Sequence, residues 1–313
     1  MRIVFCGSGE FGIPTLRALA GGHEVAAVLT QPPRRAGRGG KVRPTPAATA
    51  AEELSLAVEA VEDINDPARV AAIAALSADA MVVADFGQMI RLPAREAVGL
   101  GAINLHGSLL PELRGAAPVN WAIIRGQTAT GVTAFRLVDR MDAGPIFATR
   151  RTEIAPDETA DVLRGRLAEL GVEAVVEALE MLAAGAEPTA QDDSQATAAP
   201  RLKKSDGLID FSAGAVAIRN LVHGTWPWPG ARAKYVPVEG KPIEVQIARA
   251  AAVEGAGAPG QPGEILTDLT VATGSGRLEI VEIKPAGRRL MAWRDFANGY
   301  RAGPGAKFTA ADG

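Results

Sequence analysis

Residues 2–12 read RIVFCGSGEFG, and this stretch indicates the fold class. The unbroken apolar run of residues 3–6 is typical of a strand that is buried on both faces of a parallel sheet. The run ends in glycines, and a helical pattern follows over residues 14–20. A strand, a tight turn and a helix in this order are the start of a β–α–β unit.

The same alternation continues along the chain. Buried strands are expected at residues 24–30 (EVAAVLT), 80–86 (AMVVADF), 102–108 (AINLHGS) and 131–135 (GVTAF). Helical patterns lie between or after them at residues 48–54, 67–76 and 161–183, with a long polar loop after residue 30. We therefore predict an α/β fold with a Rossmann-like, mostly parallel sheet.

The last third of the chain has a different pattern. Residues 184–204 are polar, small and proline-containing, which is typical of a linker. A helix at 213–223 and several short strands follow, and this spacing suits a small OB-like β-barrel. The predicted domains are residues 1–184, a linker at 185–204 and a barrel at 205–313. Trp226 and Trp228 are expected to be core and domain-packing residues rather than residues that stack on RNA bases.

Composition limits the possible classes of protein. Of 313 residues, 47% are hydrophobic and 22% charged, and the net charge is −3. These values fit a packed globular protein and argue against disorder. The single cysteine, Cys6, excludes a disulfide scaffold or a cysteine-based metal site. No signal peptide or membrane-length apolar run is evident, so a cytoplasmic protein without a membrane partner is expected.

The glycines at residues 7–12 fit the pattern G-x-G-x-x-G of dinucleotide-binding folds. That interpretation needs an acidic residue about 20 positions later, and the second strand ends in Leu29-Thr30-Gln31-Pro32 instead. Arg34 and Arg35 leave an NADP site open. We favour a tight turn that lets a helix pack closely on the sheet.

Polar residues gather where the fourth predicted strand ends. Asn104 and His106 share one face of that strand, because side chains alternate along it. Open α/β sheets bind ligands at this carboxyl edge. An amide beside an imidazole suits a reaction that develops an oxyanion and moves a proton, whereas a buried histidine bonded to a carbonyl is the structural alternative. Asp142, in a turn after a later strand, is a candidate for orienting the histidine or a water molecule.

Two segments around these residues, INLHGSLLPELRGAAPVNWAI (103–123) and GVTAFRLVDRMDAGPI (131–146), closely resemble the folate-dependent formyltransferase family. The likeness extends to residues 30–46 (TQPPRRAGRGGKVRPTP), which resemble a basic insertion loop of that family. It also extends to residues 209–231 (IDFSAGAVAIRNLVHGTWPWPGA), which resemble the start of a carboxyl-terminal domain. The resemblance covers nearly the whole chain.

The resemblance implies roles for individual residues. Asn104, His106 and Asp142 are the implied catalytic residues. The implied folate site is lined by two short segments, namely Ser108, Leu109, Leu110 and Pro111 together with Phe86, Gly87, Gln88, Met89 and Ile90. Asp85 departs from the small residue that the family pattern has there. The implied formyl donor is 10-formyltetrahydrofolate, and neither a metal nor NAD(P) is expected.

The implied acceptor is the α-amine of methionine carried by initiator tRNA. Residues 25–51 contain five cations and no acidic residue, and glycines are interspersed among them. These cations, Arg34, Arg35, Arg38, Lys41 and Arg43, are therefore candidates for tRNA phosphate contacts, although a solvated surface loop is the commoner fate of a charge run. The protein is expected to act as a monomer.

Four other functions stay open from the residues alone. A formyltransferase acting on a sugar-nucleotide or ribonucleotide amine would share Asn104, His106 and Asp142 without needing the basic loop. A folate hydrolase would use water as the acceptor. An NADP reductase would rest on the glycine turn, and an RNA-binding module would rest on the barrel alone.

Overall fold

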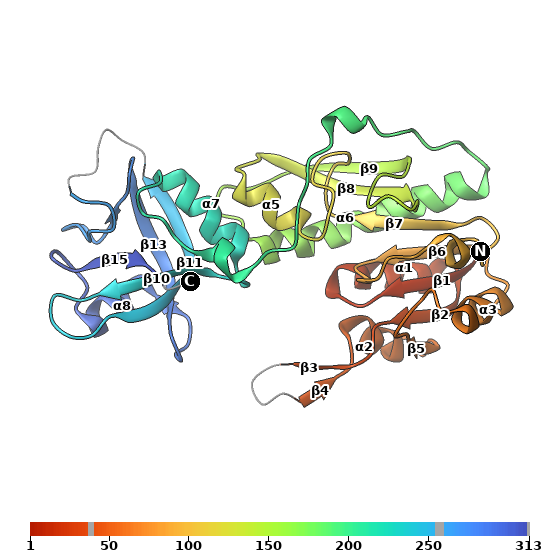
Figure 1. The fold of residues 1–313 in the computed structure, drawn as a ribbon, viewed down its shortest axis with the longest axis horizontal. Coiled ribbons are helices and arrows are strands. Elements are labelled where there is room, and N and C mark those ends of the chain that lie inside the picture. Colours follow the sequence, from red (N-terminus) through yellow and green to blue (C-terminus); the bar gives the residue numbers. More distant parts are fainter. Residues whose placement is uncertain (37–40, 254–259, 312–313) are drawn as a thin grey trace. The chain divides into compact units, whose positions relative to one another are not determined.

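The computed structural model describes residues 1–36, 41–253 and 260–311 (Figure 1). The chain forms two compact units, and each unit is built from several stretches of sequence. The first unit contains residues 1–118, 130–152 and 164–199. The second contains residues 119–129, 153–163 and the described part of 200–313.

A seven-stranded sheet lies at the centre of the first unit, counted over the described residues. Its strands, in spatial order, are β5 (Val58–Ala60), β2 (Glu24–Thr30), β1 (Arg2–Gly7), β6 (Ala80–Ala84), β7 (Ala102–His106), β8 (Ala129–Arg136) and β9 (Ile146–Glu153). Each pairing from β5 through to β7 is parallel, whereas β7 and β8 are antiparallel. The prediction of a mostly parallel, Rossmann-like sheet is confirmed.

Helices alternate with these strands along the chain. They are α1 (Ile13–Gly22), α2 (Pro46–Glu53), α3 (Pro67–Ala75), α4 (Leu92–Arg95), α5 (Pro118–Ile124) and α6 (Ala160–Ala183), with a 3-10 turn η1 (Glu10–Gly12) before α1. Strands β1, β2, β6 and β7 contribute to one buried hydrophobic cluster. Burial on both faces explains why these strands are continuous apolar runs in the sequence.

The glycine turn after β1 serves close packing. The Ser8 and Gly9 amides both donate to the Asp85 carbonyl, at 3.0 and 3.2 Å. A Cβ atom on Gly12 would lie 3.0 Å from the Cβ and carbonyl oxygen of Ala84, at the end of β6. These contacts support the tight-turn interpretation, because a Cβ on Gly9 or Gly12 would crowd the residues at the end of β6.

The predicted polar loop after β2 contains a short ribbon. Strands β3 (Arg34–Ala36) and β4 (Lys41–Arg43) pair in antiparallel register, with Arg34 opposite Arg43. In Figure 1 this ribbon extends past α2, away from the sheet. The expectation of an irregular loop was wrong at these positions, because six mostly charged residues carry no apolar alternation that would indicate strands.

The second unit contains a barrel-like antiparallel sheet, as predicted. Its strands are β10 (Ala231–Val236), β11 (Ile243–Val253), β12 (Val271–Ala272), β13 (Arg277–Pro285), β14 (Met291–Ala292) and β15 (Lys307–Ala310), and its helices are α7 (Ala215–Thr225) and α8 (Trp293–Tyr300). Tyr235 makes an edge-on contact with Phe296 and a tilted contact with Phe308 in the core of this unit. Two 3-10 turns, η2 (Asp193–Gln195) and η3 (Lys204–Gly207), lie in the polar stretch before it.

Two sequence expectations concern single features. Trp226 is half-buried, but Trp228 is 54% exposed, so the expectation that Trp228 packs inside was wrong. The prolines that flank Trp228 end the helical pattern but do not indicate which way the ring points. Within the described part of the chain, no helix is both long and apolar enough to span a bilayer.

Candidate active site

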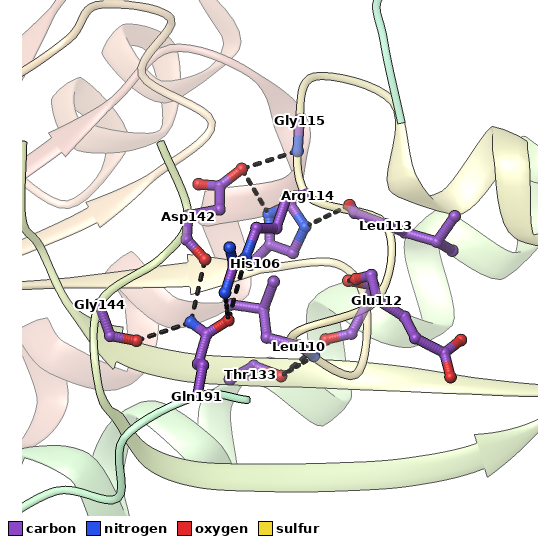
Figure 2. A network of polar contacts seen from close by, with 11 residues as sticks. His106, Leu110, Glu112, Leu113, Arg114, Gly115, Thr133, Asp142, Gly144 and Gln191 are labelled. Carbon is purple, nitrogen blue, oxygen red and sulfur yellow. Dashed lines mark hydrogen bonds and ion pairs between the residues drawn. The ribbon is translucent and has the colours of Figure 1, made fainter. Parts of the chain in front are cut away.

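His106 lies at the carboxyl end of β7, as the sequence predicted, and it is buried. Its Nε2 atom is 2.9 Å from the Leu113 carbonyl oxygen. A carbonyl oxygen only accepts hydrogen bonds, so this contact places a proton on Nε2. Nδ1 faces the Asp142 carboxylate, with 3.7 Å between Nδ1 and Oδ2 (Figure 2). The imidazole therefore has a fixed orientation and directs one nitrogen towards a negative charge.

Asp142 lies in the turn between β8 and β9. Its backbone is in the left-handed region, with a φ of +50°, which is uncommon for a residue other than glycine. The Oδ2 atom accepts a hydrogen bond of 2.8 Å from the Gly115 amide. This carboxylate is thus held between a backbone donor and the His106 ring, and it keeps a small exposed fraction of 15%.

Asn104 precedes His106 by two residues on β7 and is half-buried. Leu105 lies between them and faces helix α6, since a Cβ on Gly171 of α6 would lie 2.5 Å from the Cδ2 atom of Leu105. Alternation along the strand directs Asn104 and His106 away from α6. Within the described ranges, the Asn104 amide makes no hydrogen bond with the protein, so its N–H groups can serve a bound molecule.

The loop after β7 is fixed by internal hydrogen bonds. The Thr133 hydroxyl of β8 donates to the Ser108 carbonyl at 2.7 Å and accepts from the Leu110 amide at 3.1 Å. The Ser108 hydroxyl donates to the Glu112 carbonyl at 2.7 Å. Ser108 and Leu110 are buried, whereas Leu109 and Pro111 are half-buried. This loop leads directly to Leu113, so the same bonds that fix it also fix the partner of His106.

The second predicted folate segment, residues 86–90, follows β6. Phe86 and Ile90 belong to the hydrophobic core. The Gln88 side chain donates to the Val61 carbonyl at 2.8 Å and accepts from the Ile64 amide at 2.9 Å. Gly87 and Met89 are exposed, and Gly87 has a positive φ of 80°. Most of the segment is therefore scaffold, and its exposed positions are the ones that can meet a ligand.

Asp85, the departure from the family pattern, lies against the glycine turn with a φ of +53°. Its carboxylate occupies the space that a Cβ on Gly9 would need, at only 1.7 Å. The residue keeps an exposed surface, but desolvation by the surrounding turn raises the pKa of its carboxyl. Arg164 partly offsets this shift of the pKa, and Glu10 adds to it.

The predicted tRNA contacts fall partly outside the described residues. Arg34 and Arg43 are exposed on the β3–β4 ribbon. Arg35 and Lys41 lie on the same two strands, and Arg38 lies outside the described ranges. Arg34 is paired with Arg43 across the ribbon, and the sequence from residue 34 to residue 43 contains no acidic residue.

Sequence reasoning missed two side chains that touch the site. Thr133 lies within the strand predicted at residues 131–135, but nothing in the sequence around it indicates a role for its hydroxyl. Gln191 lies in the stretch predicted as a linker, and it bonds to the backbone of the Asp142 turn. Small polar residues are the usual signal for a linker, so this stretch gave no sign that it lies against the site.

Comparisons with known proteins show the family of the chain. A formyl transferase family model matches residues 1–179, and a formyl transferase carboxyl-terminal domain model matches residues 201–301. Methionyl-tRNA formyltransferase of Solibacter usitatus is 45% identical over 305 residues, covering 96% of both chains. The enzyme of the same name from Geobacter sulfurreducens is 40% identical over 313 residues, covering 98% of this chain and 96% of its own.

Solved structures with lower identity share the fold. HypX from Aquifex aeolicus in complex with tetrahydrofolic acid has a TM-score of 0.62 at 20% identity over 96% of this chain, which spans only 47% of that longer chain. An N-formyltransferase from Helicobacter canadensis has a TM-score of 0.64 at 14% identity, covering 89% of this chain and 97% of its own. The two domain models and the full-length relatives together place the chain in the formyl transferase family, among the methionyl-tRNA formyltransferases.

Proposed function

We propose that this enzyme transfers the formyl group of 10-formyltetrahydrofolate to the α-amine of methionine esterified to initiator tRNA. The observation that carries the proposal is the arrangement of His106 between the Leu113 carbonyl and the Asp142 carboxylate, beside the unengaged amide of Asn104. The full-length relatives with this activity in their names support the choice of acceptor. In this proposal the enzyme acts as a cytoplasmic monomer.

Each side chain has a role in the reaction. The neutral amine attacks the formyl carbon, and negative charge develops on the formyl oxygen. The Asn104 N–H groups donate to that oxygen and stabilise the charge, as in an oxyanion hole. The tetrahedral carbon then releases N10 of the folate, and the carbonyl forms again.

His106 and Asp142 handle the proton. Nδ1 and Oδ2 are 3.7 Å apart, so one amine nitrogen can lie within hydrogen-bonding distance of both atoms. The amine loses its proton to this pair, and N10 of tetrahydrofolate gains one as it leaves. The carboxylate stabilises the imidazolium that forms during the transfer, in the way that an acidic residue supports a catalytic histidine.

The two parts of the chain have separate tasks in this proposal. Residues 1–184 bind the folate through Ser108–Pro111 and Phe86–Ile90 and perform the chemistry. Residues 185–204 connect them to residues 205–313, which bind tRNA together with the basic ribbon that carries Arg34 and Arg43. Backbone and shape recognition suit a folded RNA, whose grooves offer few base contacts.

A competition between acceptors tests the proposal. The wild-type protein is incubated with 10-formyltetrahydrofolate carrying a labelled formyl group, together with charged initiator tRNA and an amino-sugar nucleotide. We expect the label on methionine. Label on the sugar amine, or released as formate at the same rate without tRNA, would instead assign a sugar formyltransferase or a folate hydrolase.

A further inference from the structure

Residues 189–199, called the crossing segment here, join the two loops that hold the catalytic pair. At one end Thr189 and Ile146 exchange backbone hydrogen bonds of 2.7 and 2.8 Å, next to the Asp142 turn. At the other end the Arg114 amide donates to the Thr197 carbonyl at 2.8 Å, next to Leu113. The crossing segment therefore bridges the Asp142 turn and the loop that fixes His106.

From this segment, the Gln191 side chain reaches both loops (Figure 2). Its Nε2 atom donates to the carbonyl oxygens of Asp142, at 2.9 Å, and Gly144, at 2.6 Å. Its Oε1 atom accepts from Nε and Nη2 of Arg114, at 3.1 and 2.6 Å. Both amide hydrogens and both lone pairs are used, and a flipped amide would meet the guanidinium donors with its own N–H groups.

The Asp142 turn needs such an anchor. A left-handed conformation is unfavourable for a residue with a side chain and persists where its surroundings hold it. Gly115 holds the carboxylate of Asp142 from one side, and Gln191 holds its carbonyl from the other. Gly144 is equally restricted, because a Cβ there would lie 1.7 Å from the Arg136 carbonyl oxygen.

The opposite end of the amide is anchored by charge. Arg114 lies between Leu113, which accepts from His106, and Gly115, which donates to Asp142. Its Nη2 atom forms an ion pair of 2.8 Å with Asp193 of the crossing segment. Gln191 thus contacts the backbone of Asp142 directly. Through Arg114 it also contacts the loop that carries Leu113 and Gly115, the partners of His106 and Asp142.

We propose that Gln191 is a positioning residue that sets the separation between the His106 ring and the Asp142 carboxylate. The proposal rests on the function assigned above. Removing the two donors frees the Asp142 carbonyl, and the turn can then relax from its left-handed conformation. The Asp142 carboxylate then moves away from Nδ1 of His106. The reaction slows, although no group that touches the substrates has been removed.

Two substitutions separate positioning from stability. Gln191→Met keeps the size of the side chain but removes all four hydrogen bonds. Gln191→Glu keeps an acceptor for Arg114 but directs an anionic oxygen at the carbonyls of Asp142 and Gly144. Gln195→Met is the matched control, since Gln195 is exposed and its side chain bonds to Asp192.

Kinetics and melting temperature are measured for all three variants. Both Gln191 variants should lower kcat by about 10- to 100-fold, because a displacement of the Asp142 carboxylate by about 1 Å is enough for a loss of this size. The KM for folate and the KM for tRNA should both stay within about threefold of wild type. The Glu variant should melt closer to wild type than Gln191→Met does, because it keeps its pairing with Arg114. In an Asp142→Asn background, Gln191→Met should change kcat by less than twofold, and Gln195→Met should match wild type throughout.

Crystal structures of the wild type and of Gln191→Met give a readout that does not depend on activity. The variant should show the Asp142 carboxylate farther from His106 than in the wild type. An unmoved carboxylate, wild-type kcat in the Gln191 variants, or a full additional loss in the Asp142→Asn background would each overturn the inference. A wild-type protein without formyl transfer, but with a displaced Asp142 in the variant, would overturn the proposed function and leave the positioning role standing.

Discussion

His106 has two partners of different character, and together they define what the ring can do. The Leu113 carbonyl fixes a proton on Nε2, which leaves Nδ1 as the nitrogen that can take a proton. The Asp142 carboxylate is 3.7 Å from that nitrogen and favours the charge that results. A base and its stabilising anion are therefore in place in the free enzyme, before substrates bind.

His223, on α7, has a structural role instead. Burial lowers the pKa of this histidine to about 4. Arg219 and Arg249 lower the pKa further, whereas Asp157 raises it. The Ala250 amide donates to Nε2 at 3.2 Å, a bond that only the neutral ring can accept. The ring is therefore neutral in the folded protein across the physiological pH range.

This neutral histidine predicts a loss of stability in acid. The unfolded chain binds a proton near pH 6.5, whereas the folded chain resists protonation down to about pH 4. The free energy of unfolding therefore does not depend on His223 titration above about pH 6.5. As the pH falls from 6.5 to about 4, this residue lowers the free energy of unfolding by up to about 3 kcal/mol. Urea unfolding of wild type and His223→Gln at several pH values measures this slope, and parallel curves would contradict the prediction.

The sequence predicts side chains whose signal is local. Asn104 and His106 could be located because they alternate at the end of an apolar strand, and Asp142 because it follows one. Gln191 and Thr133 act on backbone atoms of distant loops, and no spacing along the chain records such contacts. Asp142 was among the predicted candidates, but no local pattern in the sequence indicated its left-handed backbone.

At the scale of elements, long apolar patterns were the reliable ones. Strands β1, β2 and β6 and helix α6 lie where the sequence predicts them, because each buries a continuous face. Helices α5 and α8 and strands β9 and β15 were not predicted. They are short or partly polar, and packing rather than local pattern determines their conformation.

Two glycines of α6 test how this helix packs on the sheet. A Cβ on Gly165 would meet nothing within 4 Å, so Gly165→Ala should stabilise the protein by up to about 1 kcal/mol. A Cβ on Gly171 would lie 2.5 Å from Leu105, which is buried beside His106. Gly171→Ala should therefore destabilise the protein by about 1–3 kcal/mol, through overpacking.

Both substitutions remove the same helix-weakening residue, so each serves as the control for the other. Chemical denaturation gives the two free energies of unfolding. Equal stabilisation by both alanines would show that α6 does not pack on Leu105 in this way.

At the scale of the molecule, the two units do not divide the chain at one point. The second unit includes residues 119–129, so α5 belongs with α7. The Asn120 amide donates to the Gly224 carbonyl at 2.8 Å, and a Cβ on Gly224 would lie 2.5 Å from Ile124. The composition change at residues 184–204 could not indicate that these earlier residues belong to the second unit, because composition does not depend on long-range contacts.

The charge distribution of the molecule predicts a salt-dependent reaction. Arg34 and Arg43 are directly opposite on the ribbon, an arrangement of like charges that weakens strand pairing unless an anion binds there. Arg34→Ala should lower kcat/KM for charged tRNA and flatten its log–log dependence on salt by up to roughly one unit, with the KM for folate unchanged.

Arg17→Ala is the matched control for this charge change. Arg17 is exposed on α1, and its 3.5 Å ion pair with Glu53 contributes little to stability. Kinetics at four or five salt concentrations should show a changed slope for Arg34→Ala only. A weaker folate affinity with unchanged use of tRNA would assign the ribbon to the folate instead.

The most direct test of the central claim is the rate of formylmethionyl-tRNA formation at saturating 10-formyltetrahydrofolate and charged initiator tRNA. We expect Asn104→Ala, His106→Ala and Asp142→Asn each to lower kcat by about 10²–10³-fold, the loss typical of one group that stabilises the transition state. Asp157→Asn, which alters an exposed aspartate of the same chain, should retain the wild-type rate. Formation of formylmethionine at the wild-type rate by any of the three variants would contradict the catalytic role assigned to that residue, and no formylmethionine from the wild type would contradict the assigned reaction.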